Sequence, residues 1–213
     1  EICACLVGSE MCIRDREDPV SWEISRSLVA AVFDSISKIQ PESRIKIVRD
    51  IEVMTSDYLI ENIESAFKVW NRRGVAKHYS FDDFCSYVLP YRVAHEPLSH
   101  WRRTALQRYG HWLDSLNAPQ DIARSIAMRY PVRYNAGMTK YPYIMSYEEM
   151  DSLQWGTCDD MTAFLTLSLR AIGIPAATDV VKAWANRSSA HCWNVVKDTS
   201  VFHYIPVSYT HLR

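Results

Sequence analysis

Cys158 and His191 are the residues whose types and surroundings best fit nucleophilic catalysis. Thr157 is a good helix N-cap, and Asp160 stands three residues after it, which predicts a capping box. Cys158 then falls at the first helical position, where unpaired amides and the helix dipole favour a thiolate over a thiol. A thiolate nucleophile needs a base, and histidine can both take and return a proton near neutral pH. The alternative is a small residue tolerated at a helix start.

His191 begins a predicted strand, 33 residues after the cysteine (191 − 158). Side chains alternate along a strand, so His191 and Trp193 share one face, while Cys192 lies on the other. This alternation argues against a metal site built from Cys158, Asp159, His191 and Cys192, because the last two point apart. We therefore expect no metal and no cofactor. Cys192, like Cys85, is interpreted as a small core residue, leaving one reactive thiol outside the N-terminal tail.

The elements that would position this pair are predicted helices along most of the chain, followed by predicted strands near its end. Helical patterns precede it at 22–39, 57–72, 81–89, from Pro97 onward, and at 119–130. The helix that begins at Cys158 is apolar nearly all round, which is typical of a buried helix, and Gly173 ends it. Strand-like runs follow near 177–184, 191–197 and 201–206. The sequence therefore predicts an α+β domain with helices in front.

Three details of these elements are expected from the same patterns. Leu59, Ile63, Phe67 and Trp70 form one stripe of the 57–72 helix. Capping-box patterns open the helices after Ser80 and Ser146. Gly156, just before the nucleophile helix, is expected to allow close approach of a substrate backbone.

Both ends of the chain read differently from the rest. Residues 8–16 are GSEMCIRDR and residues 207–213 are VSYTHLR, and both resemble translated sequencing-adapter sequence. We therefore divide the chain into a non-native tail (1–16), a helical N-terminal region (17–140), a truncated catalytic core (141–206) and a second tail (207–213). A signal region would lie upstream of residue 1. We leave the compartment open, with a lean to an extracytoplasmic location.

Composition narrows the class of protein. The formal net charge is −1 and 48% of residues are hydrophobic, as in an ordinary globular domain. This charge gives no electrostatic case for binding nucleic acid or an anionic membrane. No apolar run approaches the roughly 18 residues needed to span a bilayer.

Three segments together resemble the transglutaminase-like superfamily. They are GTCDD at 156–160, LRAIGIPA at 169–176 and HCWNVV at 191–196. An upstream stretch, from Phe81 to Arg102, is similar to a helical region that precedes the core in one bacterial branch. The resemblance covers about residues 55–206 and is tightest at 153–197. It implies a papain-like core, with the cysteine on the central helix and the histidine on the adjacent sheet.

The resemblance also implies a chemistry. Cysteine-dependent acyl transfer would proceed through a thioester on a peptide or protein substrate, and water or an amine would accept the acyl group. The Cys158 amide and a donor near Gln154 or Trp155 would hold the oxyanion. Further domains are expected in the full-length protein. The alternative is a catalytically degenerate domain of the same fold, serving as a binding or spacer module.

An acidic residue that orients the histidine is the missing part. Asp198 is a poor candidate, because seven residues of strand separate it from His191 by roughly 23 Å. A hairpin turn over 198–200, with 197 opposite 201, would place the residue paired with His191 near Val207. The chain has no acid there. We therefore expect this 213-residue chain to turn over weakly.

Overall fold

The computed structural model describes residues 47–72, 74, 79–115, 117–129, 132–141, 143–182 and 190–205. The helix expected at 22–39, both tails and Val207 lie outside the described residues. The α-helices are α3 (Asp50–Val53), α4 (Ser56–Arg72), α5 (Phe81–Tyr87), α6 (Trp101–Tyr109), α7 (Pro119–Met128), α8 (Tyr147–Leu153) and α9 (Cys158–Ala171). The strands are β1 (Arg133–Tyr134), β2 (Trp155–Gly156), β3 (Ala176–Val181), β4 (His191–Asp198) and β5 (Val201–Ile205). Short 3-10 helices η2 (Gly110–Trp112) and η3 (Ala136–Lys140) complete the described elements.

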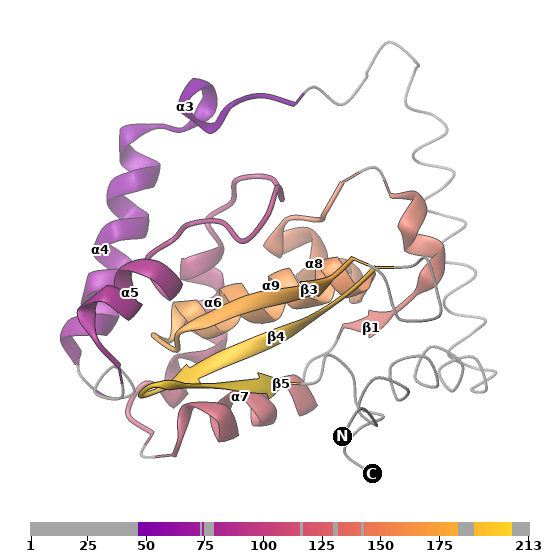
Figure 1. Ribbon diagram of the computed structural model, residues 1–213. Coiled ribbons are helices and arrows are strands. Elements are labelled where there is room, and N and C mark those ends of the chain that lie inside the picture. Colours follow the sequence, from indigo (N-terminus) through magenta and orange to yellow (C-terminus); the bar gives the residue numbers. More distant parts are fainter. Residues whose placement is uncertain are drawn as a thin grey trace.

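A sheet and several helices surround α9. The antiparallel sheet β3-β4-β5 packs with one face on α9 and α7, and α4, α6 and α8 cover other sides of α9 (Figure 1). One hydrophobic core runs from Val69 in α4 to Ile205 in β5, across the division expected at residue 140. The mixed helix and sheet content confirms the α+β prediction. No helix among the described residues is long and apolar enough to cross a membrane.

The prediction that α9 is buried on all sides is confirmed. Every residue from Asp160 to Ala171 is buried, including the polar Thr162, Thr166 and Ser168. The helix ends as expected at Gly173, which adopts φ +81°. The amide of Gly173 donates to Arg170 O (3.1 Å) and that of Ile174 donates to Leu169 O (3.0 Å), the two bonds of a Schellman motif.

The three predicted strands are present, with a register that differs from the expected one by a residue. Asp198 pairs with Val201, so the hairpin turn consists of Thr199 and Ser200, with Thr199 at φ 51°. A two-residue turn with a positive φ suits the twist of paired strands better than the three-residue turn expected from the sequence. The short parallel pair β1–β2 was not predicted.

The buried face of α4 differs from the expected stripe. Leu59 is 36% exposed and Ile63 is 41% exposed, whereas Asn62, Ala66 and Val69 face the core. The small Ala66 side chain lets α4 pack closely. Further along the helix, two predicted members of the stripe are partly buried against a satellite aromatic cluster, namely Phe67 and Trp70.

Arg102 explains why Asn62 is buried. Arg102 is 5% exposed, and its guanidinium donates to Asn62 Oδ1 (2.6 Å), to Leu89 O (3.0 Å) after α5, and to Arg170 O (3.2 Å) near the end of α9. Burial, followed by the charge of Arg170, lowers the pKa of Arg102 to about 9. One side chain thus donates to carbonyl groups at the C-terminal ends of two helices.

α6 begins at Trp101, four residues after Pro97, where the sequence predicted its start. The buried Glu96 carboxylate accepts hydrogen bonds from the amides of Val93 (2.7 Å) and Ala94 (2.8 Å). These hydrogen bonds hold residues 93–96 in a turn, so α6 starts only after this turn. The expected inner positions Trp101, Ala105 and Tyr109 are buried.

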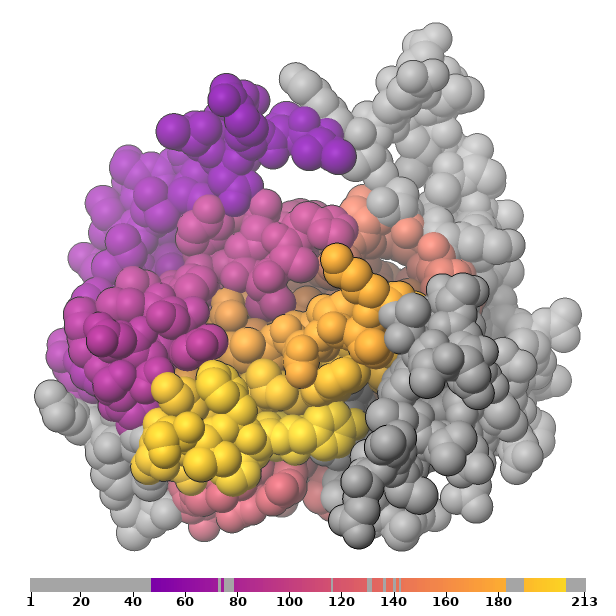
Figure 2. Space-filling view, in the orientation of Figure 1, coloured from indigo at the N-terminus to yellow at the C-terminus, as the bar shows by residue number. Residues whose placement is uncertain are grey.

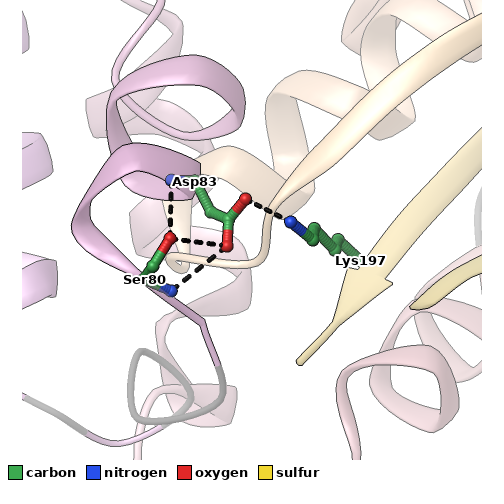
Figure 3. Close-up of polar contacts among 3 residues, drawn as sticks. All are labelled: Ser80, Asp83 and Lys197. Carbon is green, nitrogen blue, oxygen red and sulfur yellow. Dashed lines mark hydrogen bonds and ion pairs between the residues drawn. The ribbon is translucent and has the colours of Figure 1, made fainter. Parts of the chain in front are cut away.

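An ion pair joins the sheet to the helical region. Lys197 on β4 contacts Asp83 on α5, and Asp83 also completes the predicted capping box with Ser80 (Figure 3). Burial raises the pKa of Asp83, but the hydrogen bonds from Lys197 and Ser80 outweigh it and lower the pKa. The β4–β5 hairpin lies at the surface beside α5 (Figure 2), and the Tyr87 and Phe202 ring centroids lie 5.5 Å apart.

Gly173→Ala is expected to destabilise the fold by at least about 1 kcal/mol, because a left-handed conformation costs a non-glycine residue that much. A Cβ at this position would also lie 2.5 Å from Val69 Cγ1. Gly110→Ala is the matched control, since its Cβ would lie 3.7 Å from Leu106 Cδ1 and its φ is −58°. Urea unfolding should show a large loss for the first variant and none for the second. Equal effects would contradict this account of the helix end.

Candidate active site

The first turn of α9 is fixed by one buried carboxylate. Asp160 Oδ2 accepts hydrogen bonds from Thr157 N (2.8 Å) and Thr157 Oγ1 (2.7 Å), and the Asp160 amide donates to Thr157 Oγ1 (3.4 Å). The other oxygen of Asp160 accepts from the amide of Met145 (2.9 Å). The predicted capping box is therefore present, and it is also tied to the segment before α8. Cys158 is the first helical residue, as predicted.

Gly156 packs tightly against side chains of the protein itself, and the expected approach of a substrate backbone stays a prediction. A Cβ at this position would lie 2.7 Å from Asp160 Cβ and 3.0 Å from Met150 Cε. Its carbonyl accepts a hydrogen bond from the amide of Asn135 (2.9 Å). The glycine thus lets β2 pack directly on the helix start, so the close approach is made by the protein's own side chains.

A polar seam aligns α9 with β4. Asn194 Nδ2 donates to Thr162 O (2.9 Å) and to Thr166 Oγ1 (2.8 Å), and Thr162 Oγ1 lies 3.3 Å from Cys192 Sγ. Four residues of helix rise about 6.0 Å, and two residues of strand rise about 6.6 Å. Each four-residue step along α9 therefore matches a two-residue step along β4, so Thr162 and Thr166 lie level with Cys192 and Asn194. One further helical step of four residues back from Thr162 reaches Cys158.

The seam brings Cys158 to the start of β4. The alternation predicted for this strand is confirmed, since Cys192 and Asn194 are fully buried while His191 and Trp193 are half-buried. Hydrogen bonds to Cys192 and to His191 lower the pKa of the Cys158 thiol well below its usual value, together with the charge of His191. Burial and the nearby Asp159 carboxylate act in the opposite direction. The thiol and the imidazole are therefore in direct interaction.

Cys192 stays protonated while Cys158 ionises. Its hydrogen bond to Cys158 and its burial both raise the pKa of the Cys192 thiol. The two sites differ physically, because Cys158 lies at a helix N-terminus, where the dipole favours negative charge, and Cys192 is 0% exposed. Cys192 Sγ also lies within hydrogen-bond distance of Asp159 Oδ1, at 3.2 Å.

Three of the four residues weighed as metal ligands do come together. Ligand atoms of Cys158, Asp159 and Cys192 all lie within 4.8 Å of one another. His191 is not part of that group, as the strand alternation predicted. Two thiols and a carboxylate are donors of the kind that zinc accepts, and within the described residues this group offers three ligands.

Two backbone amides remain available at the helix start. The capping box uses the amides of Thr157 and Asp160. Within the described part of the chain, the amides of Cys158 and Asp159 have no acceptor. They point along the helix axis toward the N-terminal end, where an anion is favoured. A developing oxyanion could be held there.

Gln154 and Trp155, the two residues expected near the oxyanion, differ in their exposure to solvent. Gln154 is exposed and takes the left-handed conformation (φ 60°) that ends α8. Trp155 is buried in β2, with the Arg133 guanidinium 5.7 Å from its ring centroid. No hydrogen bond from either side chain to Cys158 is found among the described residues, so their role stays a prediction.

The orienting acid stays a prediction too. Asp198 lies at the far end of β4, next to the hairpin turn, in agreement with its rejection from the sequence. Val207, near which the acid was expected, lies outside the described residues. Val207 was expected to lie opposite His191 if residue 197 paired with 201. In the observed register Asp198 pairs with Val201, so each residue of β4 lies opposite a position one residue further along the chain.

Cys192 is the site residue that sequence reasoning missed. It was interpreted as core packing, and it is buried, but its thiol contacts the nucleophile candidate. The signal was present in the alternation, which turns residue 192 toward the helix that starts with Cys158. Cys85, interpreted in the same way, is exposed, because α5 turns this side chain outward.

The arrangement can support thiolate chemistry, since an acidified cysteine, an imidazole and free amides meet at one helix end. No family model matches the chain, and no curated protein matches it. The function is therefore inferred from these residues.

Native alkylation with iodoacetamide should label Cys158 at lower pH than Cys85, because hydrogen bonds to Cys192 and His191 lower the pKa of the Cys158 thiol. Tryptic peptides 141–170, 78–92 and 188–197 report Cys158, Cys85 and Cys192 separately. Cys85 serves as the exposed reference, and Cys192 should stay unlabelled. Parallel labelling of Cys158 and Cys85 across the pH range would contradict the assignment.

Proposed function

We propose that the chain is a cysteine-dependent acyl-transfer enzyme of the transglutaminase-like kind, acting on peptide or protein amides through a thioester. The observation that carries the proposal is geometric: Cys158 begins a buried helix that is held by hydrogen bonds against β4, the strand that His191 begins. The lowered pKa of the Cys158 thiol supports it. Ionisable groups with shifted pKa values of this kind concentrate at catalytic sites.

The acylation step uses groups already described. The Cys158 thiolate attacks the carbonyl carbon of the substrate amide, and the carbonyl oxygen takes the negative charge. The amides of Cys158 and Asp159 donate to that oxygen. The protonated His191 gives its proton to the departing amine as the C–N bond breaks. A thioester on Cys158 and a neutral His191 remain.

Deacylation reverses the roles. Neutral His191 takes a proton from water or from an acceptor amine, which attacks the thioester carbon. The C–S bond breaks, and the Cys158 thiolate is restored beside the protonated imidazole. Water as acceptor makes the enzyme a peptidase or amidase, and an amine makes it a transamidase. This step depends most on the orientation of the imidazole, so a missing acid would slow it.

The architecture supports a papain-like core. A buried helix that starts with the cysteine packs on an antiparallel sheet, and the histidine begins the neighbouring strand. The seam of Thr162, Thr166 and Asn194 holds the two elements in one register. These features are what acyl transfer by a cysteine–histidine pair requires, since both groups must sit on rigid elements.

An activated aryl ester of an N-acyl peptide tests the proposal directly. The 213-residue chain should gain the mass of the acyl group on peptide 141–170, and Cys158→Ala should gain none. His191→Ala should slow acylation by about 10²–10⁴-fold, the usual contribution of a general acid–base. Cys85→Ala is the matched control and should acylate normally.

The degenerate binding or spacer module is the other outcome of that experiment. Peptide binding without any adduct on Cys158, or an adduct that survives Cys158→Ala, would overturn acyl transfer. Primary amines added after acylation then identify the acceptor. Faster release with amine than with water alone indicates a transamidase.

A further inference from the structure

We infer that Cys192 is a resolving thiol that closes a reversible disulfide with Cys158 when the nucleophile is oxidised. Both cysteines are free thiols, and their sulfur atoms lie within 4.8 Å of each other. The inference rests on the proposed function only for its consequence, which is protection and silencing of the nucleophile. The chemistry of the pair stands on the geometry alone.

The positions of the two side chains suit this step. Cys192 is fully buried and is held by Thr162 Oγ1 (3.3 Å) and Asp159 Oδ1 (3.2 Å). Cys158 is the first residue of α9, and its side chain is half-buried. A disulfide needs a sulfur separation of about 2.05 Å, so one side chain must rotate toward the other. Cys158, which is partly exposed, is the less enclosed of the two.

The first chemical step needs an oxidant, and hydrogen peroxide or an organic hydroperoxide supplies it. The Cys158 thiolate attacks one peroxide oxygen, the O–O bond breaks, and hydroxide or alkoxide leaves with the electron pair. Sulfur is oxidised by two electrons and becomes the sulfenic acid. The lowered pKa of Cys158 makes it the thiol that reacts.

The second step uses the exposed Asp159 carboxylate, which lies beside the two thiols. Asp159 Oδ1 accepts the hydrogen bond of the Cys192 thiol and so takes its proton as the sulfur attacks the Cys158 sulfenic sulfur. The S–O bond breaks, and the departing hydroxide receives that proton as water. With hydrogen peroxide, the sum is two thiols and one peroxide giving one disulfide and two waters; with an organic hydroperoxide, one of the waters is replaced by the alcohol. A dithiol reductant reverses it by exchange.

This role accounts for a cluster that acyl transfer does not explain. The Asp159 carboxylate opposes the Cys158 thiolate electrostatically, which is a cost for a nucleophile. As the proton acceptor for Cys192, the same carboxylate assists the resolving step. The buried position of Cys192 also keeps it from competing for the oxidant or for acyl substrates.

The test is a titration of the reduced full chain with hydrogen peroxide, in the presence of a chelator that strips any metal from the thiols. Intact mass should fall by about 2 Da on disulfide formation. Peptides 141–170 and 188–197 should appear as one linked species that dithiothreitol separates. Cys192→Ser should lose the link and gain about 32 Da on Cys158 as sulfinic acid, which dithiothreitol does not reverse. Cys85→Ser, the matched control, should form the link normally.

The inference is overturned if wild-type Cys158 proceeds to sulfinic acid with Cys192 still alkylatable after denaturation. It is also overturned if the link forms with a cysteine other than Cys192. Mass is the readout, so the result does not depend on turnover. A link without acyl-enzyme formation would refute only the proposed function, and an acyl-enzyme without the link would refute only the disulfide.

Discussion

The enclosure of α9 is the constraint on which the rest of the structure depends. Because α9 is buried from Asp160 to Ala171, the protein itself must supply partners for the end groups of the helix that water cannot reach. At the C-terminal end, the Schellman bonds of Gly173 and the guanidinium of Arg102 do this. At the N-terminal end, Asp160 supplies the cap and binds Met145 as well.

The same enclosure produces the site. The capping box leaves two amides at the helix start without acceptors, and Cys158 stands at that point of positive potential. The polar seam then sets where β4 begins relative to the helix, so that His191 and Cys192 both reach the thiol. Stability and reactivity therefore share one set of contacts. A change that loosens the first turn of α9 would disturb both.

Local signals predicted the parts of this arrangement that are encoded over a few residues. The cap at Thr157, the helix end at Gly173 and the alternation of β4 could all be predicted from the sequence. Features that depend on packing could not. The buried face of α4 is set by Arg102, which lies 40 residues from Asn62 (102 − 62). The contact between Cys158 and Cys192 is set by the match of helix and strand rise, which no short motif carries.

The central claim is that Cys158 and His191 act as one ionisable pair. The most direct measurement is the ultraviolet absorbance of the thiolate followed across pH, for the unsubstituted chain, His191→Ala and the control His203→Ala on the adjacent strand. The account predicts a thiolate step well below the usual cysteine range that vanishes in Cys158→Ser. It also predicts that His191→Ala moves the step to higher pH, because the hydrogen bond and charge of the imidazole are lost, while His203→Ala leaves it in place. A step that does not move in His191→Ala, or that persists in Cys158→Ser, would contradict it.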